Sequence, residues 1–148
     1  MTETSTQVPS LERLIGYNLK RAYMVVQADY RAALGEEALA PRVFSALTFV
    51  VQFPQISQSD LARRLGIERS GLVAIVNELE QRGFLRRRDV PGDRRVQALE
   101  ATEEGRCACH DAMVRVQAHE DRLLSMLTDA EKTTLIDLLG RIRATEES

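Results

Sequence analysis

The sequence contains no tryptophan, and aromatic residues make up only 5% of its 148 residues. A hydrophobic core must therefore be built mainly from Leu, Val, Ile and Ala, which the 44% hydrophobic content supplies. No apolar run approaches the roughly 20 residues of a membrane-spanning helix. The polar start from Met1 to Ser10 has no signal-peptide pattern. We therefore expect one compact cytoplasmic domain without a membrane partner.

Cysteine and histidine are scarce, with only Cys107, Cys109, His110 and His119 present. Residues two apart on a helix point about 200° apart, so the two thiols can neither bind one metal ion nor form a local disulfide. Without a Gly-rich phosphate loop or a converging nucleophile and base, the sequence indicates no catalytic site, metal or cofactor. We expect the cysteines to be small packing residues and His119 to be a surface residue. A thiol redox sensor that uses Cys107 or Cys109 is the alternative.

Helical periodicity dominates the sequence. We expect a long helix from Leu11 to Leu34, ended by Gly35. Asp29 places a charge beside its apolar stripe, which predicts that the last turns are less deeply buried. A second helix should begin at Pro41 and end near Gln52, because Pro54 forbids its continuation.

Two short helices joined by a tight turn are predicted next. Ser57 is placed as the N-cap of the first, which runs from Gln58 to Leu65 and ends at Gly66. The second runs from Ser70 to Arg82, with a buried face formed by Leu72, Ile75, Val76 and Leu79. Such a pair is typical of a helix-turn-helix.

The periodicity then changes to that of strands. Residues 84–88 and 96–99 predict two strands, and Pro91-Gly92 lies in the turn between them, as in a β-hairpin. Thr102 is placed to cap a helix that runs to about Leu127, and a capping box from Thr128 to Glu131 begins the last helix. The predicted fold class is mainly α with a small β-hairpin (α+β).

Positive charge is concentrated in the helix pair and the hairpin. Between Ser59 and Arg95 there are nine arginines and six acidic residues, so this segment has a net charge of +3, whereas the whole chain has −2. Arginine suits bidentate contacts with phosphates. On this scaffold the charge favours DNA binding over a merely solvated surface. A winged helix that binds another protein is the alternative, and a salt-sensitive DNA complex would distinguish the two.

The chain resembles the MarR family of transcriptional regulators. The resemblance lies in residues 56–67, Ile-Ser-Gln-Ser-Asp-Leu-Ala-Arg-Arg-Leu-Gly-Ile, in Leu79–Leu85, and in a wing signature, here Asp93-Arg94-Arg95, then Leu99, then Thr102-Glu103-Glu104-Gly105. It covers nearly the whole chain. It implies a winged helix-turn-helix lobe at about 40–101, flanked by dimerisation helices at about 10–35 and 102–146. It also implies a homodimer on a palindromic operator, which suits the apolar surplus of the terminal helices.

The resemblance implies that the helix from Ser70 to Arg82 lies in the major groove and that Arg94 enters the minor groove, while Asp93 and Arg95 brace the hairpin. A purely structural role of these three residues is the alternative. Gly71, Val73 and Ala74 replace the polar residues usual in the family. Readout is therefore expected to use thymine methyl groups and DNA shape. The candidate DNA-contacting residues are Ser57, Arg69, Ser70, Asn77, Arg86, Arg88, Asp93, Arg94 and Arg95.

Many proteins that this chain resembles are released from DNA by small aromatic acids bound between the lobes. We therefore expect a repressor whose effector is an aromatic acid or its thioester, since apolar walls with one cation suit such a ligand. The candidate ligand-binding residues are Tyr17, Arg21, Met24, Phe44 and Phe53, with Tyr23 beside them. Ordinary core packing of these side chains is the alternative.

Overall fold

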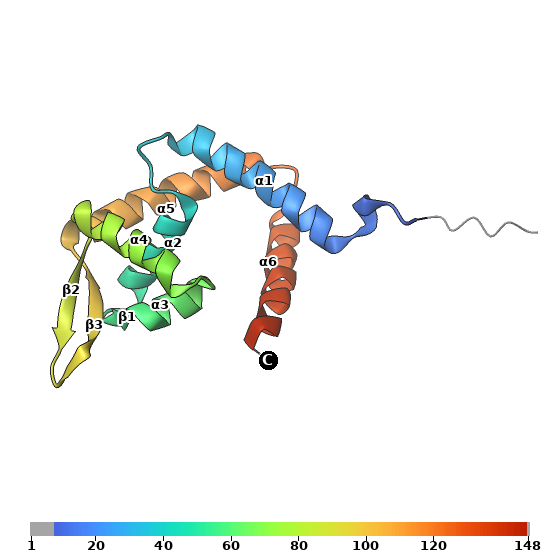
Figure 1. Cartoon of the computed structure of the whole chain (residues 1–148). Coiled ribbons are helices and arrows are strands. Elements are labelled where there is room, and N and C mark those ends of the chain that lie inside the picture. Colours follow the sequence, from blue (N-terminus) through green and yellow to red (C-terminus); the bar gives the residue numbers. More distant parts are fainter. Residues whose placement is uncertain (1–7, 148) are drawn as a thin grey trace, which may run out of the picture.

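The computed structural model describes residues 8–147, without the side chains of Arg94, Arg95 and Glu147. Two helices, α1 (Ile15–Leu34) and α5 (Glu103–Leu123), lie side by side across the top of Figure 1. A compact lobe lies below one end of this pair, and α6 (Asp129–Arg143) extends downward at the other end, apart from the lobe. The lobe consists of α2 (Pro41–Gln52), β1 (Ile56–Ser57), α3 (Gln58–Leu65), α4 (Arg69–Gln81), β2 (Leu85–Val90) and β3 (Asp93–Ala101).

The helix pair of the lobe has the predicted bounds, with α4 beginning and ending one residue earlier than expected. Ser57 caps α3, and its hydroxyl oxygen accepts from the Asp60 backbone N–H at 3.1 Å. Gly66 ends α3 with φ 66°, a left-handed conformation that glycine adopts without steric cost. The fold is therefore mainly helical with a helix-turn-helix and a wing, as the sequence predicts.

The predicted first helix is interrupted near its start. A 3-10 turn, η1 (Leu11–Arg13), precedes α1, and Leu14 between them is extended. The Ser10 hydroxyl accepts from the Glu12 N–H at 3.3 Å, while the Asn18 amide donates to the carbonyls of Glu12 and Leu14. These side-chain hydrogen bonds satisfy backbone groups at the break between η1 and α1. The expectation of one continuous helix from Leu11 was therefore wrong. At the other end of the chain, α5 stops at Leu123, short of the expected Leu127.

The wing belongs to a three-stranded antiparallel sheet of order β1-β3-β2. Strands β2 and β3 are longer than predicted and pair from Leu85 with Ala101 to Val90 with Asp93. The two-residue strand β1 pairs Ile56 with Leu99. Strand β1 was not predicted, because two residues are too short to show a strand period.

The core lies between α2, the helix pair and the base of the sheet. Nearly all of its buried side chains are aliphatic: Leu39, Val43, Ala46, Leu47, Val50, Ile56, Leu61, Ala62, Leu72, Ile75, Val76, Leu79, Leu85, Leu99 and Ala101, joined by Cys109. This composition confirms the expectation of a core that depends on Leu, Val, Ile and Ala. The four predicted core residues of α4 are all buried.

The end of α1 is its most buried part, contrary to expectation. Tyr30 and Leu34 are buried, and the Tyr30 hydroxyl donates to the Leu39 carbonyl at 2.6 Å. His119 is only 2% exposed, so the prediction of a surface residue was wrong. Its Nδ1 lies 2.7 Å from Oδ2 of Asp29. Asp29 therefore marks the α1–α5 contact, because its charge is satisfied by α5.

Candidate nucleic-acid interface

Helix α4 presents a polar face on the outside of the lobe. Opposite its buried residues it exposes Arg69, Ser70, Gly71, Val73, Ala74 and Asn77. Val73 is 41% exposed, an apolar side chain at the centre of this face. Arg69 forms no ion pair with the residues that the structure describes. The face thus offers a cation, a hydroxyl and an amide around a methyl-bearing side chain, a set able to contact phosphates and base edges.

The wing carries its arginines on both faces of strand β2. Arg86 and Arg88 are exposed, and Arg88 forms an ion pair with Glu100 on β3. Arg87 is half-buried on the face that β2 shares with Leu85. The side chains of Arg94 and Arg95 lie outside the described part of the structure, although their backbone belongs to β3. Their roles, and the bracing role of Asp93, remain predictions.

Hydrogen bonds at the start of α5 connect the base of the wing to the end of α4. The Thr102 hydroxyl donates to the Gly83 carbonyl at 2.6 Å and accepts from the Gly105 N–H at 3.0 Å. The Thr102 N–H donates to the Phe84 carbonyl at 3.0 Å. A Cβ added at Gly105 would meet the Phe84 carbonyl group. The Thr-x-x-Gly pattern therefore has a structural role: Thr102 supplies hydrogen bonds and Gly105 allows close packing, and together they hold the hairpin against the helix pair.

Two predicted contact residues already have partners within the chain. The Ser57 oxygen is used for the α3 N-cap, which leaves its O–H as the free donor. Asn77 Oδ1 accepts from Nη2 of Arg87 at 2.7 Å. Arg87 was counted among the nine arginines but not chosen as a site residue. Side chains alternate between the two faces of a strand, and this alternation along β2 would have placed Arg87 on the inner face with Leu85.

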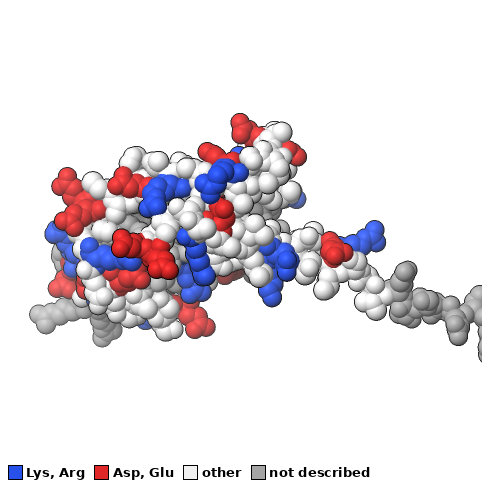
Figure 2. Space-filling model, turned by 90° about the horizontal axis from the view of Figure 1, so that it is seen from above, with Lys and Arg blue, Asp and Glu red and all other residues white. Residues whose placement is uncertain are grey.

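Charges of both signs are mixed on the face turned away from the wing. Figure 2 shows basic and acidic side chains interspersed there, with uncharged areas between them. The sequence count assigns a net charge of +3 to residues 59–95, which span the helix pair and most of the wing.

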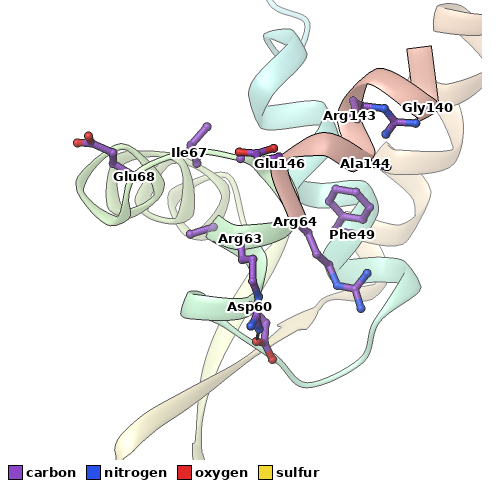
Figure 3. A pocket seen from close by; sticks show the side chains of 12 residues that line it. Phe49, Asp60, Arg63, Arg64, Ile67, Glu68, Gly140, Arg143, Ala144 and Glu146 are labelled. Carbon is purple, nitrogen blue, oxygen red and sulfur yellow. Dashed lines mark hydrogen bonds and ion pairs between the residues drawn. The ribbon is translucent and has the colours of Figure 1, made fainter. Parts of the chain in front are cut away.

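One cleft lies between the lobe and the C-terminal end of the chain. Its volume is about 1160 Å³. Helix α3 and the turn that follows it face Gly140, Arg143, Ala144 and Glu146 across it. Figure 3 shows Phe49 and Arg64 on the lobe side of the opening. Arginines and carboxylates share this lining, so it has no dominant sign of charge.

A second cleft, of about 830 Å³, lies where α1 meets the lobe. Its apolar walls include Tyr23, Leu39, Val43 and Ile75, the last from α4. Its charged lining residues are the cations Arg31 and Arg42 and the carboxylate Glu36. Apolar walls with cations at the rim are the chemistry expected for an aromatic acid.

Neither of these two clefts is lined by the predicted ligand residues Tyr17, Arg21, Met24, Phe44 and Phe53. Phe44 packs against the core, and Phe53 carries the Arg64 guanidinium 3.9 Å above its ring centre. Tyr17 is half-buried on α1, where Arg21 and Met24 are exposed. A ligand site built from these five residues stays a prediction.

The two cysteines differ in environment. Cys109 is buried with its Sγ 3.6 Å from the Thr48 hydroxyl, whereas Cys107 is exposed. A thiol sensor would therefore have to use Cys107. Over residues 8–147, no helix combines the length and hydropathy that crossing a bilayer requires.

Comparison with known proteins identifies the family. The MarR family model matches residues 39–96. A Thauera aromatica protein, provisionally named as the transcriptional regulatory protein for the hcr operon, is 32% identical over 129 residues, which cover 86% of this chain and 78% of that protein.

Solved structures of similar proteins extend over almost the whole chain. The transcriptional repressor CouR bound to a 23-mer DNA duplex is 35% identical, with a TM-score of 0.86, covering 93% of this chain and 97% of that chain. CouR from Rhodococcus jostii RHA1 bound to p-coumaroyl-CoA is 32% identical, with a TM-score of 0.79, covering 91% of this chain and 95% of that chain. The helix pair, the wing and these relatives together show that the chain belongs to the MarR family of DNA-binding transcriptional regulators.

Proposed function

We propose that this protein is a bacterial, cytoplasmic repressor that binds a palindromic operator as a homodimer. The observation that carries the proposal is the exposed polar face of α4 beside an arginine-rich wing. The 35% identity to a repressor bound to DNA supports the same function. In this proposal residues at about 40–101 form the DNA-binding lobe, and about 10–35 and 102–146 form the dimerisation helices of one MarR-type domain.

The unpaired apolar surface of the terminal helices supports the dimer. Of the described residues of α6, none is buried within the chain. The exposed apolar side chains of the terminal helices include Leu14, Ile15, Leu19, Tyr23, Met24 and Val25 near α1, and Leu135, Ile136, Leu138 and Ile142 on α6. Monomeric proteins rarely expose large contiguous apolar patches. A second copy would cover it and set two α4 helices about one DNA turn apart.

DNA binding is tested with palindromic duplexes taken from the DNA that flanks the gene. We expect a complex whose affinity falls steeply with salt, and Arg94→Ala should weaken it by about 1–3 kcal/mol without unfolding the protein. Lys20→Ala, an exposed cation on α1, is the matched control and should leave affinity unchanged. A stable monomer that binds no duplex at low salt would contradict the proposal.

We further propose that an aromatic acid or its thioester releases the operator. The complex of CouR with p-coumaroyl-CoA supports this class of effector. The second cleft suits it, because Arg31 and Arg42 border apolar walls and Ile75 belongs to α4 itself. A ligand there would contact the helix that meets DNA. It would act only if it preferred one arrangement of the lobes over the other.

The effector test titrates benzoates, hydroxycinnamates and their CoA thioesters into the protein–operator complex. Release should weaken at least tenfold in Arg42→Ala and stay unchanged in Arg21→Ala if the second cleft is the site. The reverse result would favour the cluster around Arg21 and Phe44. If no compound releases DNA, this class of effector is wrong, whereas the DNA-binding proposal stands.

A further inference from the structure

Arg87 lies in the middle of the basic strand β2, but its side chain faces α4 instead of solvent. Successive strand residues point to opposite faces, and Arg87 shares the face of buried Leu85, while Arg86 and Arg88 are exposed. The Arg87 side chain is 26% exposed. Its Nε is buried and has no hydrogen-bond partner among the described residues. A guanidinium held in this way is poorly placed to reach a phosphate.

The guanidinium instead bridges two residues of α4. Its Nη2 donates to Asn77 Oδ1 at 2.7 Å, and its Nη1 lies 3.4 Å from Glu80 Oε1. Residues three apart are neighbours on a helix surface, so the planar fork of arginine spans both of them. Glu80 neutralises the charge, and the pair of contacts joins the wing directly to the edge of α4.

This bridge orients the amide of Asn77. A free asparagine side chain can turn either its oxygen, an acceptor with two lone pairs, or its nitrogen, a donor of two N–H groups, toward a given partner. With Oδ1 turned toward Arg87, the Nδ2 group of exposed Asn77 is not the atom that faces this arginine. Adenine recognition by asparagine uses the oxygen and the nitrogen together. An Asn77 held by Arg87 keeps both N–H donors, whereas one of the two acceptor lone pairs of its Oδ1 is occupied. The donors suit acceptors such as guanine N7 and O6 or thymine O4.

We propose that Arg87 is a positioning residue for operator recognition, which fixes Asn77 as a hydrogen-bond donor toward one base edge and contacts no phosphate itself. The inference rests on the proposed DNA-binding function. It assigns different roles to adjacent arginines of one strand. Arg86, which is exposed and forms no ion pair with the described residues, can contact phosphate, whereas Arg87 acts through Asn77.

The first measurement separates these roles by salt dependence. The slope of log affinity against log salt changes by roughly 0.9 for each phosphate that a variant no longer neutralises. In a dimer, Arg86→Ala should therefore reduce the slope by about 1.8, whereas Arg87→Ala and Arg87→Lys should leave it unchanged. A slope in Arg87→Ala reduced as much as in Arg86→Ala would overturn the proposal.

The second measurement selects bound duplexes from a library with randomised half-sites. Arg87→Lys keeps the charge but cannot form both contacts, so the base preference opposite Asn77 should fall roughly tenfold, as in Asn77→Ala. The double variant Asn77→Ala/Arg87→Lys should be no less selective than either single variant, because both act on one contact. Wild-type selectivity in Arg87→Lys, or additive effects of the two changes, would refute the role.

Folding and the underlying function are checked independently. Circular dichroism should give similar melting curves for Arg87→Lys and the wild type, and Asn77→Ala is a surface change that tests the same contact if Arg87 variants unfold. If the wild type binds no duplex, the proposed function fails. If the wild type and Arg86→Ala behave as expected but Arg87→Lys selects the wild-type sequence, only the role of Arg87 fails.

Discussion

Asp29, near the end of α1, contacts two side chains of α5 and so decides how α1 packs. Asp29 accepts from the ring of His119 and from Nη2 of Arg122, the latter at 3.0 Å, so that one carboxylate satisfies two side chains of α5. The His119 ring also packs edge-on against Tyr30, with ring centres 5.7 Å apart. Because a buried polar group without a partner is costly, these contacts explain how a histidine lies inside an otherwise aliphatic contact.

The Asp29 contacts predict an acid-dependent loss of stability. The hydrogen bond from His119, followed by the charge of Arg122, lowers the pKa of Asp29 below its ordinary value, and partial burial opposes this shift. A carboxyl whose folded-state pKa is depressed stabilises the fold fully above its unfolded pKa, about 3.9. That contribution is lost as pH falls through the folded-state pKa. The stability difference between wild type and Asp29→Asn should therefore be full near pH 7 and shrink as pH falls below about 4.

Urea denaturation at a series of pH values measures this difference. Asp111→Asn removes an exposed carboxylate of α5 and serves as the control. Its curve should run parallel to that of the wild type. A constant gap between wild type and Asp29→Asn at all pH values would show that the Asp29 carboxylate does not have the proposed linkage.

Gly105 is a second single residue on which the architecture depends. A Cβ there would lie 2.8 Å from the Phe84 carbonyl carbon and closer still to its oxygen, and both are backbone atoms. Gly105→Ala should cost about 2 kcal/mol or more, since the wing would have to shift. Gly71→Ala is the matched control, because nothing lies within 4 Å of its added Cβ. It should instead stabilise α4 by up to about 1 kcal/mol. Thermal and urea denaturation measure both changes, and a mild loss in Gly105→Ala would disprove the close contact.

At the scale of elements, α6 depends on its own sequence more than on packing within the chain. None of its described residues is buried. Its start is a complete capping box, in which Thr128 Oγ1 accepts from the Glu131 N–H at 3.1 Å and the Glu131 carboxylate accepts from the Thr128 N–H at 2.9 Å. That backbone hydrogen bond lowers the pKa of Glu131. Helices with little tertiary support depend strongly on such caps.

Removing this cap should destabilise α6 selectively. Thr128→Ala should cost about 1 kcal/mol, because an N-terminal N–H loses its partner. Thr134→Ala, an exposed change inside the same helix, should be neutral or slightly favourable. Hydrogen exchange of the α6 amides gives the readout. Equal exchange in the two variants would rule out the capping role.

At the scale of the whole molecule, the apolar faces of α1 and α6 point to a shared interface, as proposed above. Ile136 is 67% exposed within one chain, a large exposure for isoleucine. Ile136→Glu should therefore weaken the dimer at least tenfold by placing a charge in the contact. Val73→Gln changes an exposed apolar residue of α4 instead and should leave the dimer intact while altering DNA binding. Sedimentation equilibrium at micromolar concentration measures both, and an unaffected dimer in Ile136→Glu would exclude α6 from the interface.

The sequence by itself determined the helices of the lobe, the wing and the family, because these features depend on local patterns. Ser57, Gly66 and Thr128 act within one turn of their own helices, and the buried face of α4 follows from its period. What only the tertiary structure decided depends on residues far apart in the chain. His119 lies 90 positions after Asp29, β1 pairs with a strand beyond the helix pair, and Arg87 meets Asn77 only after the chain has turned. No local period encodes such contacts, since each exists only once packing has brought two separate elements together.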